Sequence, residues 1–454
     1  MRKGALPAMR HGWITRTPDP MTHDDGLRRA IGPVGFGASV INIVVGGSVF
    51  VMPAVLAREL GQAAPSAYLA GAAIMALVTL SFAEAGRRTV RSGGPYVFVG
   101  SVFGPFPGYL AGLLTWLAVV CATAAVAAAL VDSLGTVVSL LTVPVARAAV
   151  LVLLFIALAA VNLRGVQAGT RLATATAIAK YLGLLVFIVL GARLVQAEHV
   201  AWAWPEDAAG LGRATIFVTF ALAGMEVPLS AGGEIRDPAR TVPRGLAGAL
   251  VLVVLLYVAV QLVAQGALGP AVSESKAPLA DALARVGRGG SALMLATGAI
   301  SMLGYLVGSI LGNSRVLFAF GRDGVLPRRL AAVHPGTQAP HVAVLVHTAI
   351  AAALSMTGTF SVLAPVAGIA IILAYIGCCA AGWKAGRRPE PDGVSSGSRL
   401  GTIAPPLAIV AMVWVLTQST RREVLALLAV LVLGSAFWWF RMKAQGGAGV
   451  RAVE

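Results

Sequence analysis

Apolar runs close to or above the length that crosses a bilayer recur along this whole chain. About 20 apolar residues in a helix span the hydrocarbon core of a membrane. Two of the runs, the third and the eighth, exceed that length, so their helices are expected to tilt or to project beyond the bilayer. The pattern predicts an all-α integral membrane protein with about twelve transmembrane helices, placed at 34–57, 66–86, 96–131, 145–163, 172–195, 211–232, 243–267, 290–319, 342–358, 361–383, 402–418 and 424–441.

The composition excludes several other classes of protein. Of the 454 residues, 57% are hydrophobic and only 12% are charged, which is too little charge to cover a soluble globule of this length. The three cysteines lie inside apolar runs and have no disulfide or metal-ligand spacing, so we expect no metal and no cofactor. No Walker A, HExxH or GxSxG motif is present, which argues against an enzyme and against ATP-driven transport.

The positive charges are distributed unevenly between the two sides of the predicted spans. With the N-terminus in the cytoplasm, the inner segments hold 25 of the 35 Lys and Arg residues, the outer loops hold 9, and Lys180 lies inside a span. This asymmetry predicts a multi-pass protein of the cytoplasmic membrane with both termini cytoplasmic. The net charge of +16 then reflects topology and attraction to anionic membrane lipids, and not nucleic-acid binding.

The order of the spans suggests a division of the chain into segments. Polar residues 1–33 form an N-terminal cytoplasmic tail without the apolar core of a signal peptide, and either Met1 or Met21 could be the start. A ten-span core is expected, and a polar cytoplasmic linker separates it from two appended helices and a cytoplasmic tail. The expected ranges are 384–400 for the linker, 401–441 for the appended helices and 442–454 for the tail.

Two of the spans contain small residues near their middle. Span one has Gly46, Gly47 and Ser48, and span six has Ala223 and Gly224 followed by Glu226 and Pro228. Interruptions five spans apart are typical of inverted-repeat transporters, whose substrate binds at the membrane midplane between two broken helices. Free amides at a half-helix start suit a carboxylate, and free carbonyls suit an ammonium. The alternative is that these small residues only allow close helix packing.

Four motifs, in order and at matching spans, resemble the amino acid–polyamine–organocation family of permeases over roughly 34–440. They read VGGSVFVMP at 45–53, GGPYVFVGSVFGPFPGYLAGLLTWLA at 93–118, FALAGMEVPLSAGGEIRDPARTVPRG at 220–245 and SRVLFAFGRDGVLPRRLAAVHP at 314–335. The resemblance implies a five-plus-five inverted-repeat core with spans one and six broken, formed by spans 1–5 at 34–195 and spans 6–10 at 211–383. Two positions depart from the family pattern: the turn ends in Ser48 instead of Gly, and Met225 stands where an aromatic residue is common.

The resemblance also implies roles for particular residues. The amides of Gly47 and Ser48 would bind the substrate carboxylate, with Gly46 and Gly224 as the bare backbone at the two breaks. The carbonyls of Val44, Phe220 and Ala223 would receive the substrate amine. Phe220 would act as an aromatic gate, and Glu226 would tie the two broken helices together by hydrogen bonds.

Lys180 is the basic residue predicted to lie well inside a span. Its position, eight residues past Leu172, is about 12 Å along the helix, which is more than a lysine stem easily spans by snorkelling. By resemblance to proton-dependent family members, its ammonium would rest against the carbonyls of span one in place of a sodium ion. Burial favours the neutral amine and carbonyl contacts favour the ammonium, so a conformational change could couple to proton binding. The alternative is a packing role without any coupling.

These features predict a secondary transporter for amino acids or closely related amines. Glu226 is the one carboxylate expected inside a span core, which favours a neutral or apolar amino acid over a polyamine or other organic cation. A non-transporting amino-acid sensor would be expected to carry a sizeable soluble domain, and no span-free stretch of that size is visible. Uptake, exchange and export, symport and antiport, the identity of the substrate and the oligomeric state stay open at this point.

Overall fold

The computed structural model of the chain describes residues 32–88, 94–164, 166–200, 203–229, 235–334, 337, 339–386 and 399–450. These residues form α-helices joined by loops and short 3-10 turns, and no β-strand occurs among them. The all-α prediction is therefore confirmed for this part of the chain. Most of the predicted tail 1–33 and of the linker 384–400, and the last residues of the predicted tail 442–454, lie outside the described residues.

The helices follow one another with short connections. Their bounds are α1 Pro33–Val44, α2 Ser48–Leu60, α3 Ala64–Arg88, α4 Gly94–Phe103, α5 Pro105–Leu134, α6 Pro144–Leu163, α7 Val166–Gly191, α8 Ala208–Leu222, α9 Glu226–Leu229, α10 Pro238–Leu268, α11 Pro278–Ala284, α12 Arg288–Arg322, α13 His341–Thr357, α14 Phe360–Gly386, α15 Arg399–Thr417 and α16 Arg421–Val450. The last helix thus continues past residue 441, where we expected it to end.

Nine helical segments among the described residues are long and apolar enough to cross a membrane. The count is lower than the twelve expected spans because it omits shorter apolar helices, such as the 17-residue α13, and because α2 and α3 are counted as one segment. The nine segments are Ser48–Phe82, Pro105–Leu134, Pro144–Leu163, Ala175–Leu194, Ala208–Pro228, Arg240–Glu274, Gly289–Gly321, Phe360–Gly386 and Arg421–Lys443.

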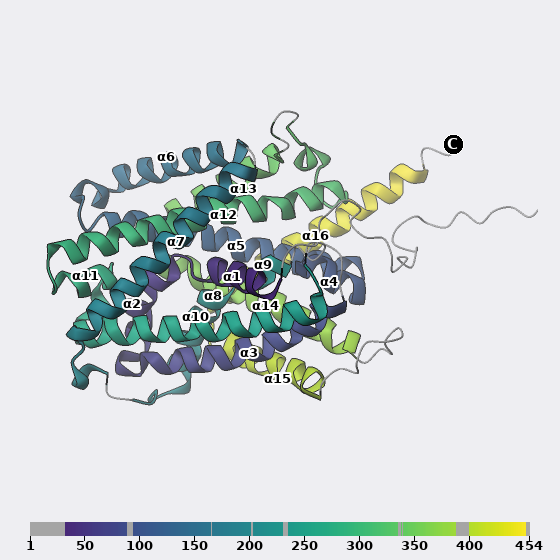
Figure 1. The fold of residues 1–454 in the computed structure, drawn as a ribbon. Coiled ribbons are helices and arrows are strands. Elements are labelled where there is room, and N and C mark those ends of the chain that lie inside the picture. The colour runs from purple at the N-terminus through teal and green to yellow at the C-terminus, as the bar shows by residue number, and fades with distance from the viewer. Residues whose placement is uncertain are drawn as a thin grey trace, which may run out of the picture.

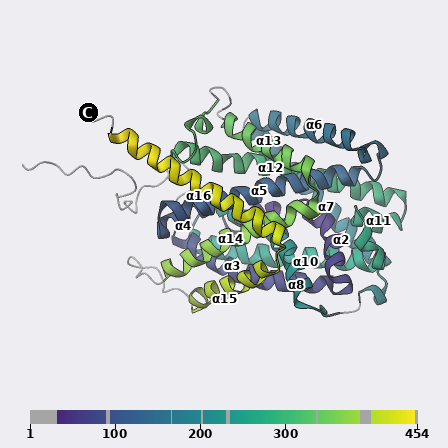
Figure 2. The ribbon, with the colours of Figure 1, turned by 180° about the vertical axis from the view of Figure 1, so that it is seen from behind.

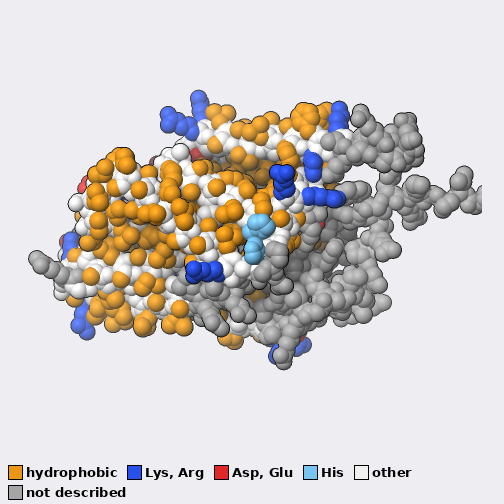
Figure 3. All heavy atoms as spheres, turned by 90° about the horizontal axis from the view of Figure 1, so that it is seen from above, with side chains coloured by type: hydrophobic (Ala, Val, Ile, Leu, Met, Phe, Trp, Pro, Cys, Tyr) orange, Lys and Arg blue, Asp and Glu red, His pale blue; other side chains and the backbone are white. Residues whose placement is uncertain are grey.

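The outer faces of several helices present large apolar side chains to the surroundings. Leu153 on α6, Leu182 on α7 and Leu433 on α16 are each more than 60% exposed. Figure 3 shows apolar side chains over most of the described part of one face, with few Lys and Arg among them. An apolar surface of this extent is covered by lipid in a membrane protein. The chain is a multi-pass membrane protein.

The helices run side by side along one long axis, with the interrupted segments in the middle (Figure 1). Helices α1, α8 and α9 lie near the centre, α6 and α13 along one side, and α3 and α15 along the opposite side. Helix α5 packs against α12, α13 and α14, whereas α10 packs against α1 and α3. The C-terminal helix α16 crosses the bundle and extends beyond it (Figure 2), and only 6% of its apolar stretch is buried.

The long third run is not one tilted helix. It divides at Gly104, whose φ of 97° is in the left-handed region that favours glycine, and Pro105 then begins α5. Helix α4 folds back on α5, and their contact is close: a Cβ at Gly108 would lie 2.7 Å from the Cα of Gly100. The first part of this run therefore forms a separate short helix, α4, and the remainder belongs to the 30-residue α5.

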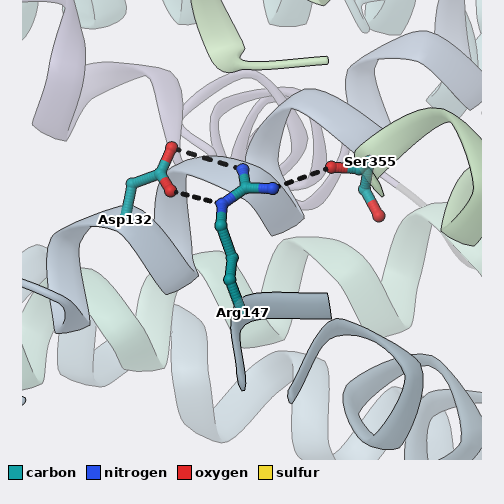
Figure 4. A network of polar contacts seen from close by, with 3 residues as sticks. All are labelled: Asp132, Arg147 and Ser355. Carbon is teal, nitrogen blue, oxygen red and sulfur yellow. Dashed lines mark hydrogen bonds and ion pairs between the residues drawn. The ribbon is translucent and has the colours of Figure 1, made fainter. Parts of the chain in front are cut away.

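A partly buried ion pair joins three helices at one end of the bundle (Figure 4). Arg147, in the first turn of α6, places Nε 2.8 Å and Nη2 3.5 Å from the two carboxylate oxygens of Asp132 near the end of α5. Its Nη1 also donates to the carbonyl oxygen of Ser355 on α13 at 3.3 Å. One guanidinium thus fixes the positions of α5, α6 and α13 relative to one another.

Candidate functional site

A cavity of about 370 Å³ lies in the middle of the bundle, where the chain between α1 and α2 meets the chain between α8 and α9. Its walls come from these segments and from α5, α7, α12 and α14. All the residues that the sequence suggested for a site line this one cavity: Val44, Gly46, Gly47, Ser48, Lys180, Phe220, Ala223, Gly224 and Glu226. Ser39 on α1 and Asn313 on α12 also line it, so it extends toward the end of the bundle where α1 begins and α12 ends.

The chain leaves α1 at Val44 and re-enters a helix at Ser48. Between them the amide of Gly46 donates to the carbonyl of Val44 at 2.8 Å, a tight turn that does not continue the helix. Ser48 opens α2, so the first amides of that helix have no carbonyl one turn back within it. Neither glycine here has a positive φ. The amide of Phe50 donates to the carbonyl of Gly47 at 3.2 Å, and the described residues include no backbone acceptor for the amides of Gly47 and Ser48, two residues that line the cavity.

Packing explains why Gly46 and Gly47 lack side chains. A Cβ at Gly46 would lie 2.9 Å from the ring of Tyr305, and one at Gly47 would lie 2.8 Å from the side chain of Met302 and 2.9 Å from that of Val126. Tyr305 and Met302 belong to the facing helix α12, and Val126 belongs to α5. The glycines thus allow these helices to approach the turn closely.

The ammonium of Lys180 on α7 binds the end of α1. Its Nζ donates to the carbonyl oxygens of Asn42 at 2.7 Å and Val45 at 2.5 Å. The side chain is only 4% exposed, and Nζ lies 5.3 Å from the ring centroid of Tyr181. Carbonyls at a helix C-terminus lack intrahelical partners and carry the negative end of the helix dipole, so a cation stabilises them.

The second interruption lies between Leu222, the last residue of α8, and Glu226, the first of α9. Gly224 has a φ of 111°, and a Cβ there would lie 2.9 Å from Ile43 of α1, so both conformation and packing require glycine. The buried carboxylate of Glu226 accepts hydrogen bonds from the amide of Gly224 at 3.1 Å and from the hydroxyl of Tyr375 on α14. Glu226 therefore holds the turn after α8 against α14.

Phe220 lies one turn before this interruption, on the cavity wall. Its ring is partly exposed and packs edge-on against Phe360 at the start of α14, with 5.7 Å between ring centroids. The two rings belong to different helices, α8 and α14.

Tyr257 on α10 connects the two interruptions, and the sequence analysis did not identify it. Its hydroxyl bonds with the hydroxyl of Ser48 at 2.9 Å and with the carbonyls of Val44 at 3.2 Å and Ala221 at 3.4 Å. A signal was available: Tyr257, Gln261 and Gln265 are spaced four apart in an otherwise apolar run, which places three polar groups on one buried helix face.

Helix α12 supplies the wall opposite the first interruption. Ser301 donates to the carbonyl of Gly46 at 3.1 Å, and the ring of Tyr305 covers the same glycine. One turn further, the hydroxyls of Ser309 and Thr123 bond at 2.7 Å and join α12 to α5.

Among the described residues that line the cavity, Glu226 is the one carboxylate and Lys180 the one cation. In the described part of the chain, no three His, Cys, Asp or Glu side chains are grouped as metal ligands would be.

Comparisons of this chain with a family profile and with individual proteins agree on one family. The profile of the family described as amino acid permease matches residues 32–440. An uncharacterized transporter of Mycobacterium tuberculosis is 34% identical over 353 residues, which cover 76% of this chain and 77% of the relative. A serine/threonine exchanger of Bacillus subtilis is 25% identical over 91% of this chain and 96% of its own length. A branched-chain amino acid permease of Bacillus subtilis is 25% identical over 78% of this chain and 80% of its own length.

Proposed function

Because the chain belongs to the amino acid permease family, within the amino acid–polyamine–organocation transporters, we propose that it is a secondary active transporter of neutral or apolar α-amino acids. The substrate binds in the cavity at the two helix interruptions. The membrane is the cytoplasmic membrane, and both termini are cytoplasmic. In that orientation the cavity faces the cytoplasm, since it extends toward the end of the bundle where α1 begins.

The observation that carries this proposal is the meeting of two interruptions at one cavity. Unpaired amides at the start of α2 suit a carboxylate, and the end of α8 offers carbonyls to an ammonium. An α-amino acid carries both groups on one carbon. Unwound backbone at membrane depth is tolerated where it lines a cavity, which is the situation of both turns.

The roles of individual residues follow from their contacts. The amides of Gly47 and Ser48 bind the substrate carboxylate, and the carbonyls of Phe220 and Ala223 receive its amine. The carbonyl of Val44 accepts from Gly46 and Tyr257, and the tyrosine hydroxyl thereby holds it in the position from which it faces the amine. Phe220 and Glu226 act as gates, one as a lid over the substrate and the other by holding α9 against α14.

Residues 34–195 and 211–383 form the two five-helix inverted repeats, and the interruptions mark the first helix of each. In this arrangement α1 with α2, and α8 with α9, are the two broken transmembrane helices. The segment 401–441 adds two helices outside the repeats. Broken first helices in both repeats, with the substrate between them, are the arrangement expected of such a transporter.

Proton coupling runs through Lys180. Its ammonium supplies the charge that the carbonyls of Asn42 and Val45 stabilise at the end of α1. Loss of the proton removes that charge and weakens the link between α7 and α1. Binding of a proton is thereby coupled to the position of α1, which forms part of the substrate site.

A carrier of polyamines or other organic cations is the alternative substrate class. Such a ligand needs carboxylates along its length, whereas the cavity presents Glu226 alone, and that carboxylate already accepts from Gly224 and Tyr375. The presence of a single, already hydrogen-bonded carboxylate therefore favours a substrate that itself carries a carboxylate.

Ligand-dependent thermal stability of the purified protein separates these classes. Leucine should raise the melting temperature in a concentration-dependent manner, because a ligand that binds only the folded state stabilises it. Leucinamide, which lacks the carboxylate, and putrescine, which has two amines, should not. Stabilisation by putrescine but not by any α-amino acid would contradict the proposed substrate class.

A further inference from the structure

Gly308 on α12 lines the cavity and faces open space. A Cβ built at this glycine would meet no atom within 4 Å. The neighbouring Gly304, one turn earlier, differs: a Cβ there would lie 2.1 Å from the hydroxyl oxygen of Thr176 on α7. Gly304 is therefore a packing position, whereas the missing side chain at Gly308 leaves room inside the cavity.

The glycines of α12 recur every four residues, at Gly304, Gly308 and Gly312. In membrane helices this spacing usually marks a surface against which another helix packs closely. That explanation holds for Gly304 but not for the other two, because a Cβ at either would meet nothing within 4 Å. Gly308 lines the cavity and Gly312 does not, so the same substitution has a different expected effect at each position.

The position of Gly308 relative to the first interruption follows from two contacts. Ser301 and Tyr305 place α12 directly against Gly46. Gly308 lies three residues beyond Tyr305, about 4.5 Å further along the helix axis. A ligand held by the amides next to Gly46 would therefore have this bare stretch of α12 within reach of its side chain.

The part of the cavity wall that α5 contributes beside α12 contains small apolar residues. The hydrogen bond between Thr123 and Ser309 holds α5 beside α12, and Ala118 and Ala122 line the cavity there. Thr123 donates its one hydroxyl proton to the carbonyl of Val119 at 2.8 Å, so Ser309 must be the donor in the bond between the two hydroxyls. Both hydroxyl protons are thus engaged within the protein, and Ala118 and Ala122 make the α5 part of the cavity wall apolar.

We propose that Gly308 determines the size of the side chain that the cavity accepts, and that the preferred substrates are amino acids with bulky apolar side chains, branched or aromatic. This inference rests on the proposed function, since it assigns the side-chain compartment of the same site. A small or hydroxylated side chain, as in alanine or serine, would leave the apolar compartment beside Gly308 unfilled.

The test compares initial rates of uptake into proteoliposomes for leucine, phenylalanine, alanine and serine. The wild-type protein is expected to prefer leucine and phenylalanine. In Gly308→Ala the ratio of leucine to alanine uptake should fall about tenfold or more, because one methyl group in an apolar pocket discriminates by about that factor. Gly312→Ala, the same change one turn further along α12 but away from the cavity wall, should keep the wild-type ratio.

Three results would overturn the inference. One is an unchanged leucine-to-alanine ratio in Gly308→Ala; another is a wild-type preference for alanine or serine. The third is a Gly308→Ala protein that fails to fold while Gly312→Ala folds, because open space at both sites predicts that both are tolerated. If the wild-type protein transports no amino acid at all, the proposed function fails instead, which is a distinguishable outcome.

Discussion

Lys180 Nζ donates a hydrogen bond to the carbonyl oxygen of Val45 over 2.5 Å and so ties α7 to the end of α1. Val45 is the first residue after α1 and lies directly before Gly46 in the cavity wall. The proposed proton coupling would act through this bond on the backbone that frames the candidate substrate site.

Lys180→Ala should abolish the dependence of transport on a pH gradient. Without the ammonium, no titratable group among the described residues contacts the carbonyls of Asn42 and Val45. A change of pH should then no longer affect the end of α1. The measurement is leucine uptake into proteoliposomes at a series of external pH values. Lys384→Ala, which removes a cation that packs on the ring of Phe103 and does not line the cavity, should keep the wild-type pH profile.

Tyr257→Phe should weaken substrate binding while the protein stays folded. The ring and its edge-on contact with Tyr68 at 5.9 Å remain, but the bonds to Ser48 and Val44 are lost. A net loss of about 1 kcal/mol, the usual contribution of one hydrogen bond, corresponds to a roughly fivefold rise in Kd. Ligand-dependent thermal shift measures it. Tyr68→Phe is the matched control, and an equal effect there would argue against a special role for Tyr257.

Phe220 should tolerate an aromatic replacement and not a small one. Phe220→Ala removes the ring that lines the cavity and the contact with Phe360, so the KM for leucine should rise about tenfold, with about 1 kcal/mol of that from lost attraction between ring and ammonium. Phe220→Trp keeps an aromatic face and should stay within about threefold of wild type. Unchanged kinetics in Phe220→Ala would remove this residue from the proposed gate.

The contact between Arg147 and Asp132 should stabilise the bundle without affecting the substrate site. Neither residue lines the cavity, and their side chains are 20% and 33% exposed. Arg147→Ala and Asp132→Ala should each lower the melting temperature. A double-mutant cycle should give a coupling free energy of about 0.5–1 kcal/mol. The KM for leucine should be unchanged in all three variants; a raised KM would show that this end of the bundle takes part in binding.

Much of the site could be anticipated from particular residues. Gly46, Gly47 and Gly224 interrupt apolar runs, and Lys180 and Glu226 are charged residues inside such runs, so both kinds of feature stand out in one sequence. The structure brings all five to one cavity. Their proposed roles still await the experiments above.

Contacts between helices that are distant in the chain could not be predicted from the sequence alone. Ser301 and Ser309 look like ordinary residues of an apolar helix, and the spacing that marks Tyr257 does not name its partners. All three residues have partners more than 180 positions away in the chain. A valine at Gly47 would disturb the packing, because a Cβ there would press on Met302 and Val126. Gly308 is the better position for adding a side chain.

The most direct measurement is the uptake of labelled leucine by the purified protein in proteoliposomes, with a pH gradient or a sodium gradient imposed separately. We expect accumulation driven by an acidic exterior, without sodium, and competed by phenylalanine but not by putrescine. Accumulation that requires a sodium gradient would contradict proton coupling through Lys180, and exchange of leucine that no gradient drives would indicate an obligate exchanger. The absence of any leucine uptake or exchange, in protein that is folded and inserted, would contradict the proposed function itself.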